Sequence, residues 1–349
     1  PTDVRLKQVV WSQERIQYRT PIKFGGRVVN DAVLFNVTVD VETTDGRRGQ
    51  GFGSMPMGNV WGWPSAVLTG EETLAAMIEF ATQVVAAADS ADLSGHPLEI
   101  TYALSSGHAS ILAAVVAKCA LKDQMPRLAQ LVAASPLEAA IYDAYGKALG
   151  ENSYNLLGRE FVNSDLSGYL TPEFTGEYLD QYTSRKCKPR MPLYHLVGAL
   201  DPLTAAEVVS PIGDGLPETL GEWITADGLT HLKIKLNGDD LTWDVGRVAA
   251  VERVAQEAQT ARGCNAWHYS LDFNEKCANV QYVLDFLAKV EEKSPSALRR
   301  VHYIEQPTHR DLRANPENRM HAAAKIKPVV IDESLVDLAS LQLAREQGY

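Results

Sequence analysis

The sequence predicts an α+β domain, made of an antiparallel meander and helices, followed by a β/α domain with a parallel sheet. Three observations support this. The chain has 349 residues, 45% of them hydrophobic, which suffices for two domains of about 100–200 residues each. Its first part changes from runs rich in Val, Ile and Thr to helical periodicity. After Arg190, short apolar runs alternate with helical stretches five times, as they do in parallel sheets.

The meander is predicted from two β-type runs, 4–18 and 32–43, and a shorter third run at 49–52. Asp45-Gly46 separates the second run from the third. This dipeptide is typical of tight hairpin turns, which need positive φ angles. We therefore expect neighbouring antiparallel strands.

Helical periodicity follows over 71–88, 109–131 and 135–149. We expect the last of these helices to begin with Ser135 as its N-cap and Pro136 at its first helical position. Gly150 is expected to end it, because glycine readily adopts the left-handed conformation that closes helices.

The mixed polar stretch 161–190 indicates a connection. We place the α+β domain at 1–160 and the β/α domain at 191–349. The predicted strand and helix pairs of the second domain are 193–197 with 218–226, 231–236 with 241–262, 267–272 with 278–291, 301–304 with 316–325, and 328–331 with 336–347. Such a sheet is either doubly wound or closed into a barrel. No GxGxxG or GxxxxGK[ST] motif follows these strands, which disfavours a Rossmann or P-loop nucleotide site.

The charge balance limits the classes of molecule that the protein is expected to bind. With 33 Lys and Arg against 44 Asp and Glu, the formal net charge is −11, so nucleic acids and anionic membranes would be repelled, and small molecules or metal cations remain. The four cysteines lack CxxC or zinc spacing, which favours a reducing, cytoplasmic location. The most apolar stretch, 109–117, is too short for a bilayer, which needs about 20 residues.

Polar residues gather where four consecutive predicted strands end: Lys233-Ile234-Lys235, Asp272-Phe273-Asn274, Glu305-Gln306-Pro307 and Asp332-Glu333-Ser334. The carboxyl ends of parallel strands meet at one edge, where active sites form. Residues two apart share a strand face, so Lys233 and Lys235 point the same way. Each motif alone is weak, because paired lysines are mostly solvated and an Asp after a strand is often a helix N-cap. Their recurrence at one edge favours a single site.

Two ammonium groups on one buried face need acidic partners, which the next three strands supply. Carboxylates held close repel one another unless a divalent cation lies between them, and oxygen ligands favour Mg²⁺. A lysine beside another lysine and a metal is expected to have a pKa lowered towards that of a general base. These parts predict proton abstraction from the carbon next to a metal-bound carboxylate.

These motifs, together with Pro136-Leu137-Glu138-Ala139-Ala140-Ile141-Tyr142-Asp143-Ala144-Tyr145-Gly146-Lys147, resemble the enolase superfamily. The resemblance covers nearly the whole chain and lies in the branch of mandelate racemase and muconate lactonizing enzymes. It implies an α+β capping domain and a TIM-type (β/α) barrel, of which five β/α units are present. It also implies a Mg²⁺-dependent lyase or isomerase that acts on a small-molecule carboxylate through an enolate. We further expect a homo-oligomer.

The resemblance assigns roles to individual residues. Lys235 would be the base, and Lys233 would tune it and contact the substrate carboxylate. The implied Mg²⁺ ligands are Asp272, Glu305 and Asp332, supported by Asn274 and Glu333. Strand parity alone does not choose between Asp332 and Glu333 as the ligand. The Asp332-Glu333-Ser334 form is closer to muconate lactonizing enzymes and dipeptide epimerases than to mandelate racemase.

Two loops of the capping domain, near 20–27 and 54–63, would close over the substrate. Gly25-Gly26 permits backbone movement. The residues expected to select the part of the substrate remote from the metal are Lys23, Phe24, Met55 and Trp61, with further apolar surface from Met57 and Trp63. Packing at a domain interface is the alternative for the Met and Trp residues.

Three functions remain open. The first is α-proton abstraction followed by epimerisation, cycloisomerisation or elimination. The second is acid-sugar dehydration, and the third is metal binding without catalysis. A complete barrel has eight strand and helix units, so the resemblance implies that a second acid/base, a Lys of the sixth strand or a His of the seventh, lies beyond Tyr349. We expect the natural chain to continue there; the alternative is a degenerate barrel whose open edge is covered.

Overall fold

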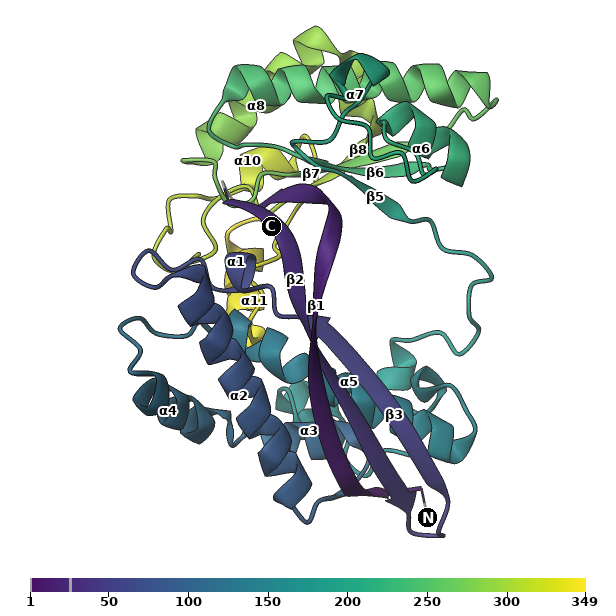
Figure 1. Ribbon diagram of the computed structural model, residues 1–349, viewed down its shortest axis with the longest axis vertical. Helices are drawn as coiled ribbons and strands as arrows, with labels where there is room; N and C mark the ends of the chain where they lie inside the picture. Colours follow the sequence, from purple (N-terminus) through teal and green to yellow (C-terminus); the bar gives the residue numbers. More distant parts are fainter. Residues whose placement is uncertain (1, 25–26) are drawn as a thin grey trace. The chain divides into compact units, whose positions relative to one another are not determined.

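The structure is a computed structural model that describes residues 2–24 and 27–349. Its contacts divide the chain into two compact units (Figure 1). Unit 1 comprises Pro1–Tyr18 and Asp31–Lys188, and unit 2 comprises Arg19–Asn30 and Pro189–Tyr349. The end of the first strand and the start of the second strand thus belong to unit 2. The remainder of both strands belongs to unit 1.

Unit 1 contains the predicted antiparallel sheet, with strand order β3-β2-β1-β4. The strands are β1 (Val4–Phe24), β2 (Arg27–Thr43), β3 (Arg48–Pro56) and β4 (Ser94–Gly95). Along β2, every second side chain from Val33 to Thr43 is buried, because successive side chains of a strand point to opposite faces. The buried face packs into a core with Met77 and Phe80 of the helical layer.

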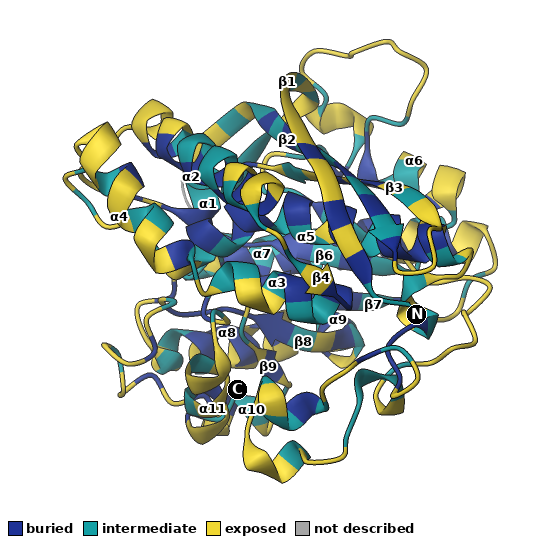
Figure 2. Ribbon diagram, turned by 90° about the horizontal axis from the view of Figure 1, so that it is seen from below, coloured by how far each residue is buried: buried dark blue, intermediate teal, exposed yellow. Residues whose placement is uncertain are grey.

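The helices of unit 1 are α1 (Asn59–Gly62), α2 (Gly70–Ser90), α3 (Pro97–Ser105), α4 (His108–Cys119) and α5 (Arg127–Leu149). Short 3₁₀ turns follow: η1 (Ser153–Asn155), η2 (Leu166–Gly168), η3 (Pro172–Phe174) and η4 (Leu179–Gln181). The helix α5 is largely buried whereas α4 is largely exposed (Figure 2). Among the described residues, no single helix is long and apolar enough to cross a membrane, although α3 and α4, bent by 45°, reach that length and composition together.

Strand β3 lies directly on α5. A Cβ atom added to Gly49, Gly51 or Gly53 would come within 2.2 Å of a carbonyl oxygen of the helix. These oxygens belong to every fourth residue of α5: Ala144, Ala140 and Pro136. The alternating glycines therefore let the strand backbone approach the helix backbone closely.

Two helix boundaries predicted from the sequence are wrong. The chain is not helical from 109 to 131, because α4 ends at Cys119 and α5 begins at Arg127 after Pro126. Nor does a helix begin at Ser135, because α5 continues through Pro136. A proline cannot donate to the carbonyl four residues earlier, and the Ser135 hydroxyl donates to that Val132 carbonyl instead, at 2.8 Å. Gly150 ends α5 in the left-handed conformation as predicted.

Unit 2 is built on a parallel sheet with strand order β5-β6-β7-β8-β9. Its strands are β5 (Tyr194–Val197), β6 (His231–Lys235), β7 (His268–Asp272), β8 (Val301–Glu305) and β9 (Val329–Val330). The helices of this unit are η5 (Ala205–Glu207), α6 (Leu220–Asp227), α7 (Leu241–Ala261), α8 (Val280–Lys293), α9 (Pro295–Arg300), α10 (His321–Ala324) and α11 (Leu338–Glu346). Because the strands follow one another without a reversal of order, the sheet is a partial barrel rather than a doubly wound sheet. The predicted fold class is confirmed.

One face of this sheet packs against the helices, with α7 and α8 over it in Figure 1. Leu232 and Ile234 of β6, and Tyr269 and Leu271 of β7, are fully buried on this face. The alternate residues of the same strands, which include the predicted site residues, lie on the opposite face.

Candidate active site

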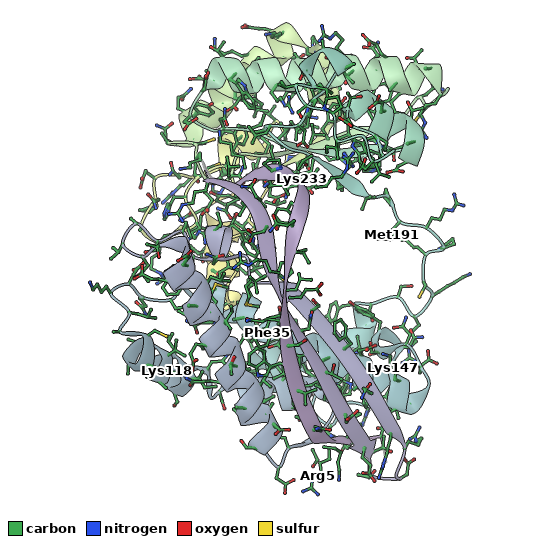
Figure 3. All side chains as sticks on the ribbon, viewed as in Figure 1. Arg5, Phe35, Lys118, Lys147, Met191 and Lys233 are labelled. Atoms are coloured by element: carbon green, nitrogen blue, oxygen red, sulfur yellow. The ribbon has the colours of Figure 1, made fainter. Side chains whose placement is uncertain are left out.

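Three neighbouring strands bring Lys235, Asp272 and Glu305 together at the carboxyl edge of the sheet. Lys235 is the register partner of Asp272, and Asp272 is the register partner of Glu305. The Lys235 Nζ atom donates to Asp272 Oδ2 and, at 3.0 Å, to Asn274 Oδ1. Lys233, labelled in Figure 3, places its Nζ atom 3.1 Å from Asp272 Oδ2 and 2.5 Å from Glu305 Oε1. The two lysines thus have the acidic partners that their burial requires.

Burial and the neighbouring charges shift the pKa values of Lys233, Asp272 and Glu305. Burial opposes the charge of Lys233, but Asp272 and Glu305 outweigh it and raise the Lys233 pKa. Burial also opposes ionisation of Asp272, but the two lysines lower its pKa. Burial and the charge of Asp272 raise the pKa of Glu305 to about 7. The neighbouring carboxylates therefore favour the charged form of Lys233.

The predicted third acid follows β9. Asp332 is exposed, and its charge contributes to raising the pKa of Glu305. The adjacent Glu333 is half-buried, and its Oε2 atom has no hydrogen-bond partner among the described residues. Burial, Glu275 and Asp332 raise the Glu333 pKa to about 8. The carboxyl ends of β7, β8 and β9 thus carry a surplus of negative charge.

Carboxylate oxygens have the donor chemistry of a magnesium site, and the unpartnered Glu333 oxygen together with the raised Glu305 pKa indicates charge that a divalent cation would offset. Over residues 2–24 and 27–349, however, no three His, Cys, Asp or Glu side chains are grouped so that they could hold a metal ion. Asp272 and Glu305 instead contact lysine ammonium groups. The residues fit Mg²⁺ by chemistry and charge, and binding would require their side chains to rearrange.

Three non-glycine residues with positive φ lie directly after β7 and β8: Asn274 at 48°, Glu275 at 65° and Gln306 at 34°. Such conformations are uncommon outside glycine and are found often at functional sites. The Arg310 side chain donates hydrogen bonds to Glu275, with its Nε atom 2.7 Å from Oε1 and its NH2 atom 2.6 Å from Oε2. This pair joins the loop after β7 to the loop after β8. Sequence reasoning missed it, because no motif relates two residues that are 35 positions apart.

The loop after Lys235 is held by a separate set of hydrogen bonds. Asp244 in α7 is fully buried and accepts hydrogen bonds from the backbone N–H groups of Asn237, at 2.7 Å, and Gly238, at 2.9 Å. It also accepts from the Tyr282 hydroxyl at 2.6 Å. Sequence reasoning missed this residue too; its one signal was its place as an acid in the first turn of a helix.

The tip of the β1–β2 hairpin contributes Lys23 and Phe24 to this region of unit 2. The Lys23 Nζ atom donates to Asn237 Oδ1 at 3.0 Å, and Lys235 Nζ lies 5.6 Å from the centroid of the Phe24 ring. A small cavity is lined by Lys23, Ala199, Leu236, Asn237, Asp239, Asn274 and Lys276. Gly25-Gly26, the predicted flexible pair, lies outside the described residues.

The other predicted loop residues belong to unit 1. Met55 in β3 and Trp61 in α1 are partly buried against the core of that unit. Met57 and Trp63 are 2% and 1% exposed within the same core. The expectation that these last two offer surface to a substrate is wrong, because their side chains are used in packing.

No protein-family model matches the sequence, and neither does any curated protein. Solved structures do match. The dipeptide epimerase from Enterococcus faecalis V583, complexed with Mg and the dipeptide L-Leu-L-Tyr, has a TM-score of 0.55 at 16% identity, over 99% of this chain and 72% of that chain. This chain therefore shares its fold with that dipeptide epimerase. The likeness establishes the fold alone.

Two further structures support this fold and leave the subgroup unresolved. The muconate lactonizing enzyme from Pseudomonas fluorescens, complexed with muconolactone, has a TM-score of 0.53 at 16% identity, over 98% of this chain and 70% of that chain. The L-Ala-D/L-Glu epimerase from Bacillus subtilis, in a substrate-liganded complex, has a TM-score of 0.55 at 18% identity, over 95% of this chain and 68% of that chain. Epimerases and a lactonizing enzyme thus match with similar TM-scores.

Proposed function

We propose that unit 2 carries the site of a Mg²⁺-dependent lyase or isomerase, in which Lys235 removes the α-proton of a small carboxylate. The observation that carries the proposal is the buried cluster of Lys233, Lys235, Asp272 and Glu305 at the carboxyl edge of a partial barrel. Active sites of such barrels lie at this edge. The fold is shared with epimerases that were solved with magnesium or with a substrate.

The proposed roles follow from the contacts. Lys235, 8% exposed, would act as a neutral amine whose Nζ atom accepts the proton when the α C–H bond breaks. Asp272 and Asn274 hold this Nζ atom in place. The Lys233 ammonium, which is more exposed, would bind an oxygen of the substrate carboxylate. Delivery of a proton to the opposite face by an acid other than Lys235 would give epimerisation, whereas loss of a leaving group would give elimination.

Asp272, Glu305 and Asp332 would hold the magnesium ion, with Glu333 as the neighbour of the last ligand. The ion, when bound, supplies positive charge that stabilises the enolate. Lys23 and Phe24 lie close enough to Lys235 and Asn237 to contact the part of the substrate remote from the reacting carbon.

Hydrogen exchange in D₂O tests the proposal. The protein is incubated with Mg²⁺ and a panel of dipeptides, acid sugars and aromatic carboxylates, and deuterium at Cα is measured by mass spectrometry. We expect incorporation with at least one class and a fall of about 10²–10⁴-fold in Lys235→Ala, the range of a lost general base. Lys235→Arg keeps the positive charge beside Asp272 but is not a base at neutral pH, so it should be equally inactive. Lys289→Ala, an exposed residue of α8, is the matched control and should retain the wild-type rate.

The products separate the alternatives. An inverted Cα indicates epimerisation, and a dehydrated product indicates acid-sugar dehydration. Exchange that persists in both Lys235 variants contradicts the role of Lys235. Absence of exchange with every class, despite measurable magnesium binding, favours the binding protein without catalysis.

A further inference from the structure

Gln306, the residue after Glu305, is completely buried beneath the candidate site. Its side-chain Oε1 atom accepts two backbone hydrogen bonds, from the N–H of Asp332 at 2.9 Å and from the N–H of Ser334 at 3.1 Å. Its Nε2 atom donates to the carbonyl of Thr308 at 3.1 Å. One amide therefore holds the turn after β9 and the loop after β8.

The backbone of Gln306 extends these connections to a third strand end. Its N–H donates to the carbonyl of Val330 at 2.9 Å, and its carbonyl accepts from the N–H of Glu275 at 3.0 Å. The loops after β7, β8 and β9 thus all bond to this one residue. Its φ of 34° is unfavourable for any residue other than glycine. Such a conformation persists where the surrounding contacts impose it.

Only an amide side chain fits this position without loss. A carboxylate would keep acceptors for the two N–H groups but have no donor for the Thr308 carbonyl. An apolar side chain of the same length would leave two buried N–H groups and one carbonyl without partners, which is costly. The turn is further fixed by the Ser334 hydroxyl, which donates to the Arg310 carbonyl at 2.8 Å.

We propose that Gln306 is a positioning residue, whose buried amide holds the turn that carries Asp332 beside the strand end that carries Glu305. It contacts neither substrate nor metal; it acts through the backbone of Asp332. The expected effect of Gln306 on magnesium affinity rests on the proposed function, whereas its effect on the order of the turn does not.

The test compares Gln306→Met with Gln259→Met. Gln259 is equally buried and also bonds a loop, through its Nε2 atom to the Leu229 carbonyl at 2.7 Å, but that loop precedes β6. Both variants should lose stability. Hydrogen–deuterium exchange of the metal-free protein should become at least tenfold faster at Asp332 and Ser334 in Gln306→Met alone. The magnesium Kd from calorimetry should rise about 10–100-fold in this variant alone, as expected when a ligand loses its support.

Gln306→Glu keeps the Oε acceptors and should restore slow exchange at Asp332 and Ser334. If Gln306→Met does not fold, Gln306→Asn, whose amide is one methylene too short, takes its place with the same expectations. Unchanged exchange of these two amides in the Met or Asn variant, or equally fast exchange in Gln306→Glu, overturns the proposal. A wild-type protein that binds no magnesium overturns the proposed function, while the exchange measurement still decides on Gln306.

Discussion

The two ends of the parallel sheet in unit 2 carry different chemistry on the same face. At the carboxyl ends, Lys235 and Asp272 form part of a cluster of ion pairs. At the amino ends of the same strands lie imidazole rings. The His231 and His268 centroids are 4.9 Å apart, and those of His268 and His302 are 4.0 Å apart in a stacked arrangement.

This difference separates two kinds of stabilisation. Stacked rings need contact but no particular partner, so one ring can be exchanged at small cost. Buried charges need partners of opposite sign at hydrogen-bond distance, and removal of one partner leaves another charge unpaired. We therefore expect the carboxyl end to tolerate substitutions less well than the amino end.

Comparing the stability of Asp272→Asn with that of His268→Asn tests this contrast most directly, because the two residues are at opposite ends of β7. Asp272→Asn leaves Lys235 without its acidic partner and should lower the free energy of unfolding by about 3–5 kcal/mol. His268→Asn should lower it by less than about 1 kcal/mol. Urea unfolding followed by circular dichroism measures both. Equal losses would show that the ion-pair cluster is no more demanding than the ring stack.

A smaller effect is expected from the face that packs on the helices. Near the amino end of β7, the Tyr269 hydroxyl donates to Glu252 Oε2 at 2.5 Å and accepts from the Trp267 indole at 2.8 Å. Tyr269→Phe removes both bonds and leaves a buried carboxylate without this donor, so unfolding should be easier by about 1–3 kcal/mol.

This variant also separates stability from function. Magnesium binding and hydrogen exchange into substrate should keep their wild-type values in Tyr269→Phe, because the lost bonds lie on the opposite face from Lys235. Tyr303→Phe, at a half-buried tyrosine of β8, is the matched control and should change the unfolding free energy by less than about 0.5 kcal/mol. A weaker magnesium affinity in Tyr269→Phe would mean that the two faces are not independent.

The sequence was sufficient where a short-range pattern decides the structure. The strand and helix units of unit 2 follow apolar runs of about five residues and helical periodicity, so β7 was predicted at 267–272 and found at His268–Asp272. Strand parity likewise placed Lys233 and Lys235 on one face of β6, and both lysines contact Asp272 of β7.

Contacts between distant segments could not be predicted in this way. The apolar periodicity gave no sign that α5 would run through Pro136, because this depends on the Ser135 hydroxyl that takes the place of a backbone donor. The hairpin tip with Lys23 was expected near a substrate, but its bond to Asn237 depends on a strand far longer than its alternating pattern indicated. The hydrogen bonds of Gln306 were not predicted, because its side chain bonds residues up to 28 positions away.

The smallest predicted effect is a change in proton binding at the amino end. Burial lowers the pKa of His231 and of His268 below 6.5, and the charge of His302 lowers both further, with His231 and Arg300 adding to the effect at His268. Tyr194 also contacts this cluster through His231, and Tyr303 contacts Tyr194. In His302→Asn the pKa values of His231 and His268 should therefore rise towards 6.5, as measured by NMR titration of the imidazole protons.

The direction of these pKa shifts determines how the stability of the protein changes with pH. A histidine whose pKa is lower in the folded than in the unfolded protein contributes stability above about pH 6.5 that is lost as the pH falls towards the folded value. His302→Asn should make this acid-induced loss smaller. His195, on the other face of β5 against Trp223, has a pKa lowered by burial and serves as the internal control. A shift of His195 equal to those of His231 and His268 would mean that the three imidazoles do not interact as a local cluster.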